Sequence, residues 1–264
     1  VYDDKGWNNK SYEAIGDPFY SDTSDFKVTI LAPAEYKIGS TGKVTESKTD
    51  HKKSMYTIEA KNVRDFAFLL SKKFNVKKDY VGDTEIVTYN LNNKFSDLAT
   101  KISKESIEIF NDMFGKYPYN IYSVIASDFY IGGMEYPTLS MIDEGLYTNK
   151  NKFLLEYVIA HETAHQWWYS VVGNDEVSEP WLDEALTEYS TILYFEKKYG
   201  KNIANNLMDT MATQTKSYSS KDIFKPCDQY KNSTEYSLNV YTKGAVIFHS
   251  IRQEVGDKVF FNVL

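Results

Sequence analysis

The sequence predicts an α+β fold, in which an antiparallel β segment is followed by a mostly helical unit. Within residues 1–90, short runs alternate between apolar and polar residues and are separated by turn-forming residues, a pattern that is typical of strands. From about Phe95, apolar residues instead recur every three or four positions, as they do on one face of a helix. The 264 residues suffice for one or two domains, and we expect the boundary between the two parts near residue 80.

Four runs in the first part carry the strand pattern: residues 25–31, 56–60, 65–70 and 84–89. In the first run, apolar and polar side chains alternate, so that one face of the strand can be buried while the other meets solvent. Pro33 and the turn at residues 39–42 interrupt the pattern. We therefore expect a layer of short antiparallel strands.

The second part begins with an amphipathic helix over residues 95–114, and residues 122–142 indicate a strand, a loop and another strand. The remaining pattern predicts four helices, over residues 152–172, 178–200, 202–217 and 238–254. Gly173 is expected to stop the first of these four helices. Ser178 is expected to cap the second, with Pro180 in its first turn.

The composition excludes several classes of function. Asp and Glu (37 residues) outnumber Lys and Arg (30), which gives a net charge of −7, whereas proteins that bind nucleic-acid duplexes carry a basic surface. We therefore expect no nucleic-acid partner. No apolar run approaches the roughly 18 residues of a membrane-spanning helix, so we expect no membrane span within this chain. The single cysteine, Cys227, excludes an internal disulfide.

The segment His161-Glu-Thr-Ala-His165 indicates a metal site. At about 100° per residue, the two histidines lie about 40° apart on one face of a helix, so both imidazoles can bind one Zn²⁺. Glu162 lies beside the pair, where its carboxylate can accept a proton from a metal-bound water. The alternative is a structural role for all three in a packed core, and it is disfavoured because buried polar groups without a shared partner are costly.

Glu184 is the candidate for a third zinc ligand, because catalytic zinc usually takes three protein ligands and leaves one position for water. Eighteen residues separate it from His165, which suits the end of one helix, a turn and the start of an antiparallel helix. Taken alone, Glu184 would be an exposed carboxylate that the helix dipole favours. Glu188 lies one turn further along the same face, either accepting a hydrogen bond from a ligand imidazole or exposed to solvent.

These residues resemble the M1 family of zinc aminopeptidases, whose catalytic domain is similar to thermolysin. The family pattern of His-Glu-x-x-His, 18 residues and Glu matches residues 161–184. Gly132-Gly-Met-Glu-Tyr136 resembles the family's Gly-x-Met-Glu-Asn motif, and Tyr241-Thr-Lys-Gly244 matches its Tyr-x-Lys-Gly. Residues 16–22 and 25–30 resemble the later half of the N-terminal β domain of bacterial members.

The resemblance implies a zinc-dependent aminopeptidase that acts on peptides with a free N-terminus. One Zn²⁺ per chain would be held by His161, His165 and Glu184, and would polarise the scissile carbonyl and acidify its bound water. Glu162 would take the proton of that water and return it to the leaving amine.

Further roles also follow from the resemblance. Glu135, within the motif that includes Gly132, Gly133 and Met134, would bind the free α-amino group of the substrate, since an ammonium in a partly desolvated cleft needs a carboxylate counter-charge. Tyr241 would donate its hydroxyl to the developing oxyanion.

The resemblance also has consequences for the domains. Residues 1–80 would be the later part of an N-terminal β domain, and residues 81–264 a mostly helical, thermolysin-like catalytic domain. The large C-terminal helical domain of the family is expected to be absent from this chain, which would then hold zinc in an open cleft with weak activity. The bacterial-type β segment favours a location outside the cytoplasm or at the cell surface.

Two residues depart from the family pattern. Tyr136 stands where the family has Asn, and is expected to reshape the edge of the amine pocket; Asp183 stands where Asn often precedes the third ligand. If Tyr136 disables amine anchoring, the alternative function is a thermolysin-like endopeptidase. A non-catalytic, peptide-binding module of the same fold is a further alternative, which the presence of Glu162 disfavours because such a module needs no general base.

Overall fold

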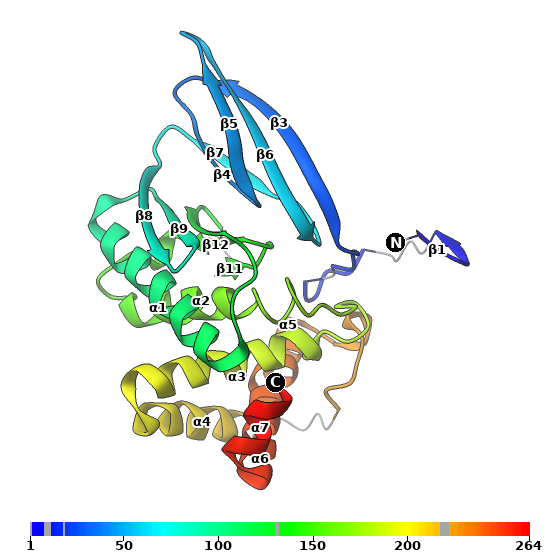
Figure 1. Ribbon diagram of the computed structural model, residues 1–264. Helices are drawn as coiled ribbons and strands as arrows, with labels where there is room; N and C mark the ends of the chain where they lie inside the picture. The colour runs from blue at the N-terminus through cyan, green and yellow to red at the C-terminus, as the bar shows by residue number, and fades with distance from the viewer. Residues whose placement is uncertain (1, 8–11, 18, 130–131, 217–221) are drawn as a thin grey trace. The chain divides into compact units, whose positions relative to one another are not determined.

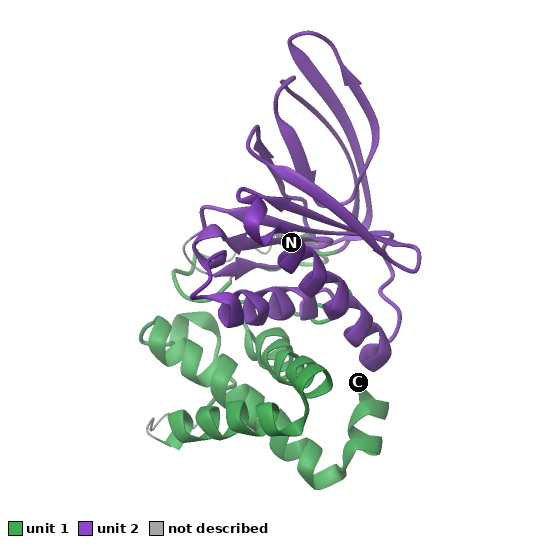
Figure 2. Ribbon diagram, turned by 90° about the vertical axis from the view of Figure 1, so that its left-hand side faces the viewer, with its two compact units in different colours: residues 1–22, 167–264 green, residues 23–166 purple. Residues whose placement is uncertain are grey.

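The computed structural model describes residues 2–7, 12–17, 19–129, 132–216 and 222–264 (Figure 1). The chain forms two compact units, which Figure 2 colours separately. Unit 1 comprises residues 1–22 and 167–264, and unit 2 comprises residues 23–166. Antiparallel sheets precede a mostly helical region along the chain, so the α+β prediction is confirmed. The domain boundary near residue 80 stays a prediction.

Two antiparallel sheets in unit 2 contain the first long strands. The three-stranded sheet has the order β3-β6-β5, and the second sheet pairs β4 with β7. These strands are β3 (Ser24–Pro33), β4 (Lys37–Ser40), β5 (Lys43–Thr49), β6 (Lys53–Val63) and β7 (Phe68–Ser71). Along β3, half-buried and exposed side chains alternate, as the sequence predicts for residues 25–31. A short hairpin, β1 (Tyr2–Asp3) and β2 (Gly6–Trp7), belongs to unit 1.

A mixed five-stranded sheet, in the order β11-β12-β10-β9-β8, carries the rest of unit 2. Its strands are β8 (Asn75–Val81), β9 (Thr84–Asn90), β10 (Ile121–Ser127), β11 (Gly133–Met134) and β12 (Leu139–Asp143). Strands β9, β10 and β12 are parallel, and β8 and β11 form antiparallel edges. The strand predicted over residues 84–89 is β9, which pairs antiparallel with β8 as expected; a helical crossover then leads from β9 to β10 and returns the chain in the same direction, so β10 pairs with β9 in parallel.

Helices α1 (Ser96–Phe114) and α2 (Lys152–Ala164) pack against this sheet and against each other. α1 contacts β8 and β9, and α2 contacts β11 and β12. α1 agrees with the helix predicted over residues 95–114 and ends at Gly115, whose φ of +97° suits glycine. Two 3₁₀ turns, η1 (Asn93–Phe95) and η2 (Glu144–Leu146), lead into the two helices.

The predicted helix over residues 152–172 is too long. α2 ends at Ala164, well before Val172, and Tyr169 has a φ of +145°, which no α-helix allows. Of the apolar residues beyond α2, the aromatic ones at 167–169 are buried in unit 1, where Trp168 donates its indole N–H to the Ser190 hydroxyl over 2.9 Å, whereas Val171 and Val172 are exposed. Because this stretch is apolar on all sides, its pattern contains no signal for the end of the helix.

Unit 1 is built mainly from helices. They are α3 (Trp181–Tyr199), α4 (Lys201–Lys216), η3 (Cys227–Gln229), α5 (Ser233–Ser237), the π-helix η4 (Leu238–Lys243), α6 (Gly244–Val255) and α7 (Asp257–Val263). α3 packs against α4, η4 and α6. No helix in the described stretches has the length and apolar character that crossing a bilayer requires.

The starts of two helices in unit 1 differ from the prediction. α3 begins at Trp181 with Pro180 at its N-cap, and the Ser178 hydroxyl donates to Asp175 over 2.9 Å instead of capping the helix. The helix predicted over residues 238–254 begins with a π-helix, which the ordinary helical period does not reveal. α4 ends at Lys216, and residue 217, its predicted last residue, lies outside the described residues.

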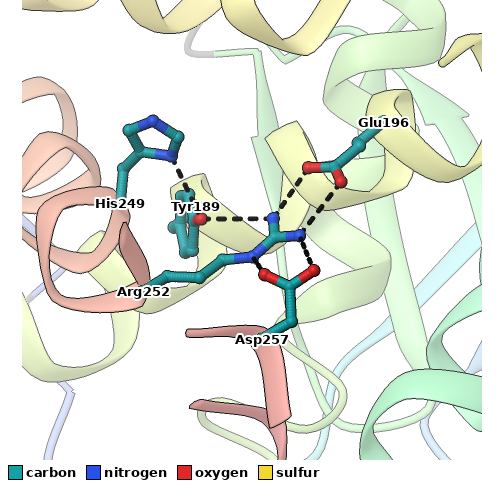
Figure 3. Close-up of polar contacts among 5 residues, drawn as sticks. All are labelled: Tyr189, Glu196, His249, Arg252 and Asp257. Carbon is teal, nitrogen blue, oxygen red and sulfur yellow. Dashed lines mark hydrogen bonds and ion pairs between the residues drawn. The ribbon is translucent and has the colours of Figure 1, made fainter. Parts of the chain in front are cut away.

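A polar network fastens α6 and α7 to α3 (Figure 3). The Arg252 guanidinium donates to Glu196 over 2.7 and 3.0 Å and to Asp257 over 2.8 and 3.1 Å. It also reaches the Tyr189 hydroxyl at 3.5 Å, and that hydroxyl lies 3.2 Å from His249 Nδ1. Two paired carboxylates compensate the buried charge, so the network holds the three helices in one arrangement.

Candidate metal and catalytic site

The C-terminal end of α2 carries the two histidines that the sequence assigns to a metal, His161 in the last turn and His165 at the C-cap. His161 and His165 are both buried, and their rings lie edge to face with centroids 4.9 Å apart. Thr163, between them, lies on the opposite side of the helix, since each residue adds about 100° of rotation. The two imidazoles are therefore presented together on one face, as predicted.

Hydrogen bonds from the sheet fix the rotation of α2. The Tyr122 hydroxyl on β10 lies 2.9 Å from Thr163 Oγ1 and 2.8 Å from Ser140 Oγ on β12. The Ser140 hydroxyl also donates to the backbone carbonyl of Glu162 over 3.2 Å. All these groups are buried, where a hydrogen bond is costly to break. The face of α2 that carries Thr163 is thus held on the sheet, and the histidine face is directed away from it.

The carboxylate of Glu162 lies directly against the backbone of β11. A Cβ atom added to Gly133 would lie only 2.2 Å from Glu162 Oε1, so only glycine fits there. Gly132, just before it, has a φ of +98°, and Met134 and Glu135, just after it, are buried. Unit 2 therefore brings the candidate general base into contact with the motif that contains the candidate amine-binding residue.

Tyr136, which departs from the family motif, turns its side chain toward the sheet. The ring packs against a buried apolar cluster of Phe74, Ile125 and Leu139. Its backbone carbonyl accepts hydrogen bonds from Leu139 N and from the Gln166 amide. The tyrosine in place of asparagine thus contributes apolar packing on the side of the loop that faces the sheet.

α3 in unit 1 carries the acidic candidates. Glu184 is 3% exposed and Glu188 is 8% exposed, so neither is the solvated surface carboxylate that each could be from the sequence alone. Asp183, the second departure from the family pattern, is also buried. α3 therefore offers a cluster of buried carboxylates in its first two turns.

Tyr241 contacts the candidate zinc ligand of its own unit, because its hydroxyl donates a hydrogen bond to Glu184 Oε1. The residue lies in the π-helix η4, and the ring of Tyr236 packs edge-on against it at 5.9 Å. Burial, and secondly the charge of Glu184, raise the pKa of Tyr241 well above its ordinary value. The phenol therefore keeps its proton and acts as a hydrogen-bond donor.

The close approach of two helices sets this contact. A Cβ added to Gly244, the last residue of the Tyr-x-Lys-Gly motif, would lie 2.2 Å from the Cβ of Ala185. Ala185 follows Glu184 on α3, and Gly244 follows η4 at the start of α6. Glycine thus lets the element that carries Tyr241 approach the start of α3.

The donor set fits zinc. His161, His165 and Glu184 each offer a buried ligand atom, and two imidazoles with one carboxylate are a known ligand set of catalytic zinc, which keeps a further position for water. A Mg²⁺ or Ca²⁺ site would be built from oxygen ligands instead.

Two contributors to the site, Tyr122 and Gln166, were not identified from the sequence, and Gly244 was identified only as part of the Tyr-x-Lys-Gly motif. Gln166 could have been noticed as a lone amide between His165 and two tryptophans, since a buried amide requires hydrogen-bonding partners. The packing role of Gly244 could have been inferred from its place within a helical pattern, where a glycine indicates close packing. Tyr122 is one of 22 tyrosines and carries no such local signal.

Comparison with known proteins agrees with this geometry. The profile of the Peptidase family M1 domain matches residues 98–264. Aminopeptidase N of Lactococcus lactis subsp. lactis is 28% identical over 189 residues, which cover 62% of this chain and 21% of that protein. Probable aminopeptidase 2 of Sulfurisphaera tokodaii is 25% identical over 210 residues, which cover 71% of this chain and 26% of that protein. The chain thus spans about a fifth to a quarter of the length of these curated relatives.

The fold is similar to that of a solved structure. The crystal structure of an M1 zinc metallopeptidase from Deinococcus radiodurans matches with a TM-score of 0.73 at 18% sequence identity. The match covers 92% of this chain and 55% of that one. The buried two-histidine and glutamate set, together with the family match, assigns zinc as the cofactor.

Proposed function

The chain belongs to peptidase family M1, and on that premise we propose that it acts as a zinc aminopeptidase, which removes residues from the N-terminus of peptides. The observation that carries the proposal is the contact between Glu162 and Gly133. This contact places the proposed general base, Glu162, next to the segment that carries Glu135, and both belong to unit 2. The relatives named above as aminopeptidases support the same activity.

His161, His165 and Glu184 would hold the zinc ion. When bound, zinc supplies Lewis-acid polarisation of the scissile carbonyl and lowers the pKa of the attacking water. Glu188, one turn after Glu184 and buried, would accept a hydrogen bond from a ligand imidazole and fix its tautomer.

Glu162 would act as the general base and then as the general acid. Its carboxylate takes a proton from the attacking water and returns it to the leaving amine. The backbone of Gly133 limits the space on one side of this carboxylate, which restricts its rotamers. A base held in one place needs little reorganisation during the reaction.

Glu135 would select substrates with a free N-terminus. Its carboxylate is buried, and an α-ammonium bound beside it would pair charge with charge. A peptide held by its first residue presents its first peptide bond to the base, which explains removal of one residue at a time. Gly132, Gly133 and Met134 would form the adjoining wall of this pocket.

Tyr241 would stabilise the oxyanion. Its hydroxyl keeps its proton, because burial and Glu184 raise its pKa, and it donates to Glu184 in the structure. In the reaction, the same O–H would be directed at the negative charge that develops on the carbonyl oxygen.

The principal alternative is a thermolysin-like endopeptidase, which would follow if Tyr136 prevented amine binding. The direction of the Tyr136 ring disfavours this alternative, because the ring packs on the apolar cluster of the sheet. The further alternative is a non-catalytic peptide-binding module. Such a module would bind zinc and peptides but would cleave neither peptides with a free N-terminus nor N-acetylated peptides.

A panel of fluorogenic aminoacyl substrates, assayed with the natural full-length protein, tests the proposed activity. We expect hydrolysis that is lost on dialysis against a chelator and restored by one equivalent of Zn²⁺. Hydrolysis that persists without metal, or no hydrolysis of any aminoacyl substrate by the zinc-loaded protein, would contradict the proposal.

A further inference from the structure

Gln166, the residue after the second histidine, is fully buried and uses both ends of its amide. Its Oε1 accepts a hydrogen bond from the Thr138 backbone N–H at 2.7 Å and lies 3.4 Å from the Tyr117 hydroxyl, whose one proton is shared with the Ile121 carbonyl at 3.2 Å. Its Nε2 donates to the backbone carbonyl of Tyr136 at 3.2 Å. The amide therefore binds the loop between β11 and β12 at two backbone positions, the Tyr136 carbonyl and the Thr138 N–H.

The partners determine the orientation of this amide. Oε1 faces the Thr138 N–H and Nε2 faces the Tyr136 carbonyl, so the reversed orientation would oppose donor to donor and acceptor to acceptor. A side chain here needs an acceptor and a donor at one tip. Glutamine meets this need, whereas an ionised glutamate satisfies only the Thr138 side and methionine satisfies neither.

The loop requires such support because its backbone is strained. Thr138 has a φ of +62°, which is costly for a β-branched residue and persists only where the surroundings fix it. Besides Gln166, the Thr138 hydroxyl accepts from Gly42 N at 2.7 Å, and Leu139 N donates to the Tyr136 carbonyl at 2.8 Å. Removal of the amide would remove the hydrogen bonds that hold the backbone of Tyr136 and Thr138 in this turn.

Glu135 lies between two attachments of the loop to α2. Before it, Gly133 lies against the Glu162 carboxylate; after it, Tyr136 is bound by Gln166. Both attachments come from the same few residues of α2 and its C-terminal end. The position of Glu135 relative to this end of the helix therefore depends on Gln166.

We propose that Gln166 is a positioning residue, whose amide places Glu135 so that its carboxylate meets the α-ammonium of the substrate. This inference rests on the proposed aminopeptidase function. Gln166 acts through the loop and touches neither substrate nor metal in this role. Its effect should fall on recognition of the free amine more than on the chemical step.

The test compares Gln166→Glu and Gln166→Met with the wild type and with Gln253→Glu, a matched change at an exposed position on α6. For an aminoacyl fluorogenic substrate we expect KM to rise on the order of tenfold in Gln166→Met and less in Gln166→Glu, with kcat changed less than about threefold. Gln253→Glu should match the wild type. Zinc content should stay at one per chain in all variants.

A second readout is binding of alaninamide and N-acetylalaninamide, measured as competitive inhibition constants. The wild type should prefer the free amine, and the Gln166 variants should lose most of that preference. The inference would be overturned if folded Gln166→Glu and Gln166→Met kept the wild-type preference for the free amine. It would also be overturned if kcat and zinc content fell in parallel with the rise in KM. If Gln166→Met does not fold, Gln166→Glu decides. A wild type without preference for the free amine would overturn the proposed function itself, which distinguishes the two failures.

Discussion

Glu162 and Gly133 are in direct contact. This contact brings the candidate base for proton transfer next to the segment that carries the candidate amine-binding residue. The carboxylate that moves protons lies against the strand whose next residues include Glu135. Two negative side chains in one buried region are tolerated where cations are bound, and the function we propose supplies both a metal ion and an ammonium group.

Replacement Glu162→Gln keeps the shape of the side chain and removes its basicity. We expect zinc binding to persist and kcat to fall by about 10²–10⁴-fold, the usual contribution of a general base. Metal analysis and steady-state kinetics on the same sample measure both. Wild-type-like turnover in this variant would exclude Glu162 as the base.

Replacement Tyr241→Phe removes only the hydroxyl that donates to Glu184. If the hydroxyl also stabilises the oxyanion, kcat should fall by about 10²–10³-fold with little change in KM. Tyr236→Phe is the matched control, because this neighbouring buried tyrosine has no assigned step in the reaction. Equal effects of the two substitutions would show that Tyr241 acts through packing alone.

At the scale of elements, the zinc helix could be predicted from the sequence and its end could not. His161, Glu162 and His165 lie within four positions, so local helical geometry brings them together without any tertiary information. The end of α2 depends on where Trp168 is buried and on what Gln166 binds, and these are tertiary choices. The π-helix of Tyr241 likewise packs against several helices of unit 1, and such contacts leave no local signal in the sequence.

The close contact of Gly244 with Ala185 leads to a test of how the tyrosine is placed. An alanine at 244 would bring two Cβ atoms within 2.2 Å, so η4 and α3 must separate. We expect Gly244→Ala to destabilise the protein by about 1–3 kcal/mol and to lower kcat. Helix propensity alone would favour alanine by about 1 kcal/mol, so destabilisation identifies the contact.

The compensating change Ala185→Gly provides the control for this prediction. The double variant Gly244→Ala, Ala185→Gly restores the space and should recover most of kcat, measured alongside thermal unfolding. A double variant as inactive as Gly244→Ala would contradict the role of this contact.

The network on α6 predicts a pH dependence of stability. Burial, and secondly the Arg252 charge, lower the pKa of His249 below its ordinary value of about 6.5, against the weaker pull of Glu196 and Asp209. Between the lowered pKa and about pH 6.5, His249 is therefore protonated in the unfolded chain and neutral in the folded chain. The contribution of neutral His249 to the free energy of unfolding is therefore fully present above about pH 6.5, and it is lost as the pH falls toward the lowered pKa of the folded state.

Urea unfolding of the zinc-saturated protein between pH 5 and 8 measures this dependence. His249→Gln should flatten the acid limb of the curve, whereas His51→Gln, at an exposed histidine, should not. Parallel curves for wild type and His249→Gln would exclude His249 as the source.

At the scale of the whole molecule, the sequence predicted the order of β and helical parts and the chemistry of the site. It could not predict which strands run parallel, because the direction of β10 follows from the packing of α1 across the sheet. Nor could it reveal that Tyr241 contacts Glu184, since 57 positions separate them and no local period links such residues. Resemblance to a family supplied the roles of Glu135 and Tyr241, and both remain to be tested by substitution.

The central claim is that the site recognises the free N-terminus of a peptide. The most direct test compares kcat/KM for one peptide with a free α-amino group and for the same peptide N-acetylated, using the natural full-length protein loaded with zinc. We expect the free peptide to lose its first residue and the acetylated peptide to be cleaved at least about 10²-fold more slowly, since a buried carboxylate left without its counter-charge costs about 3–5 kcal/mol. Equal cleavage of the two peptides would contradict the account.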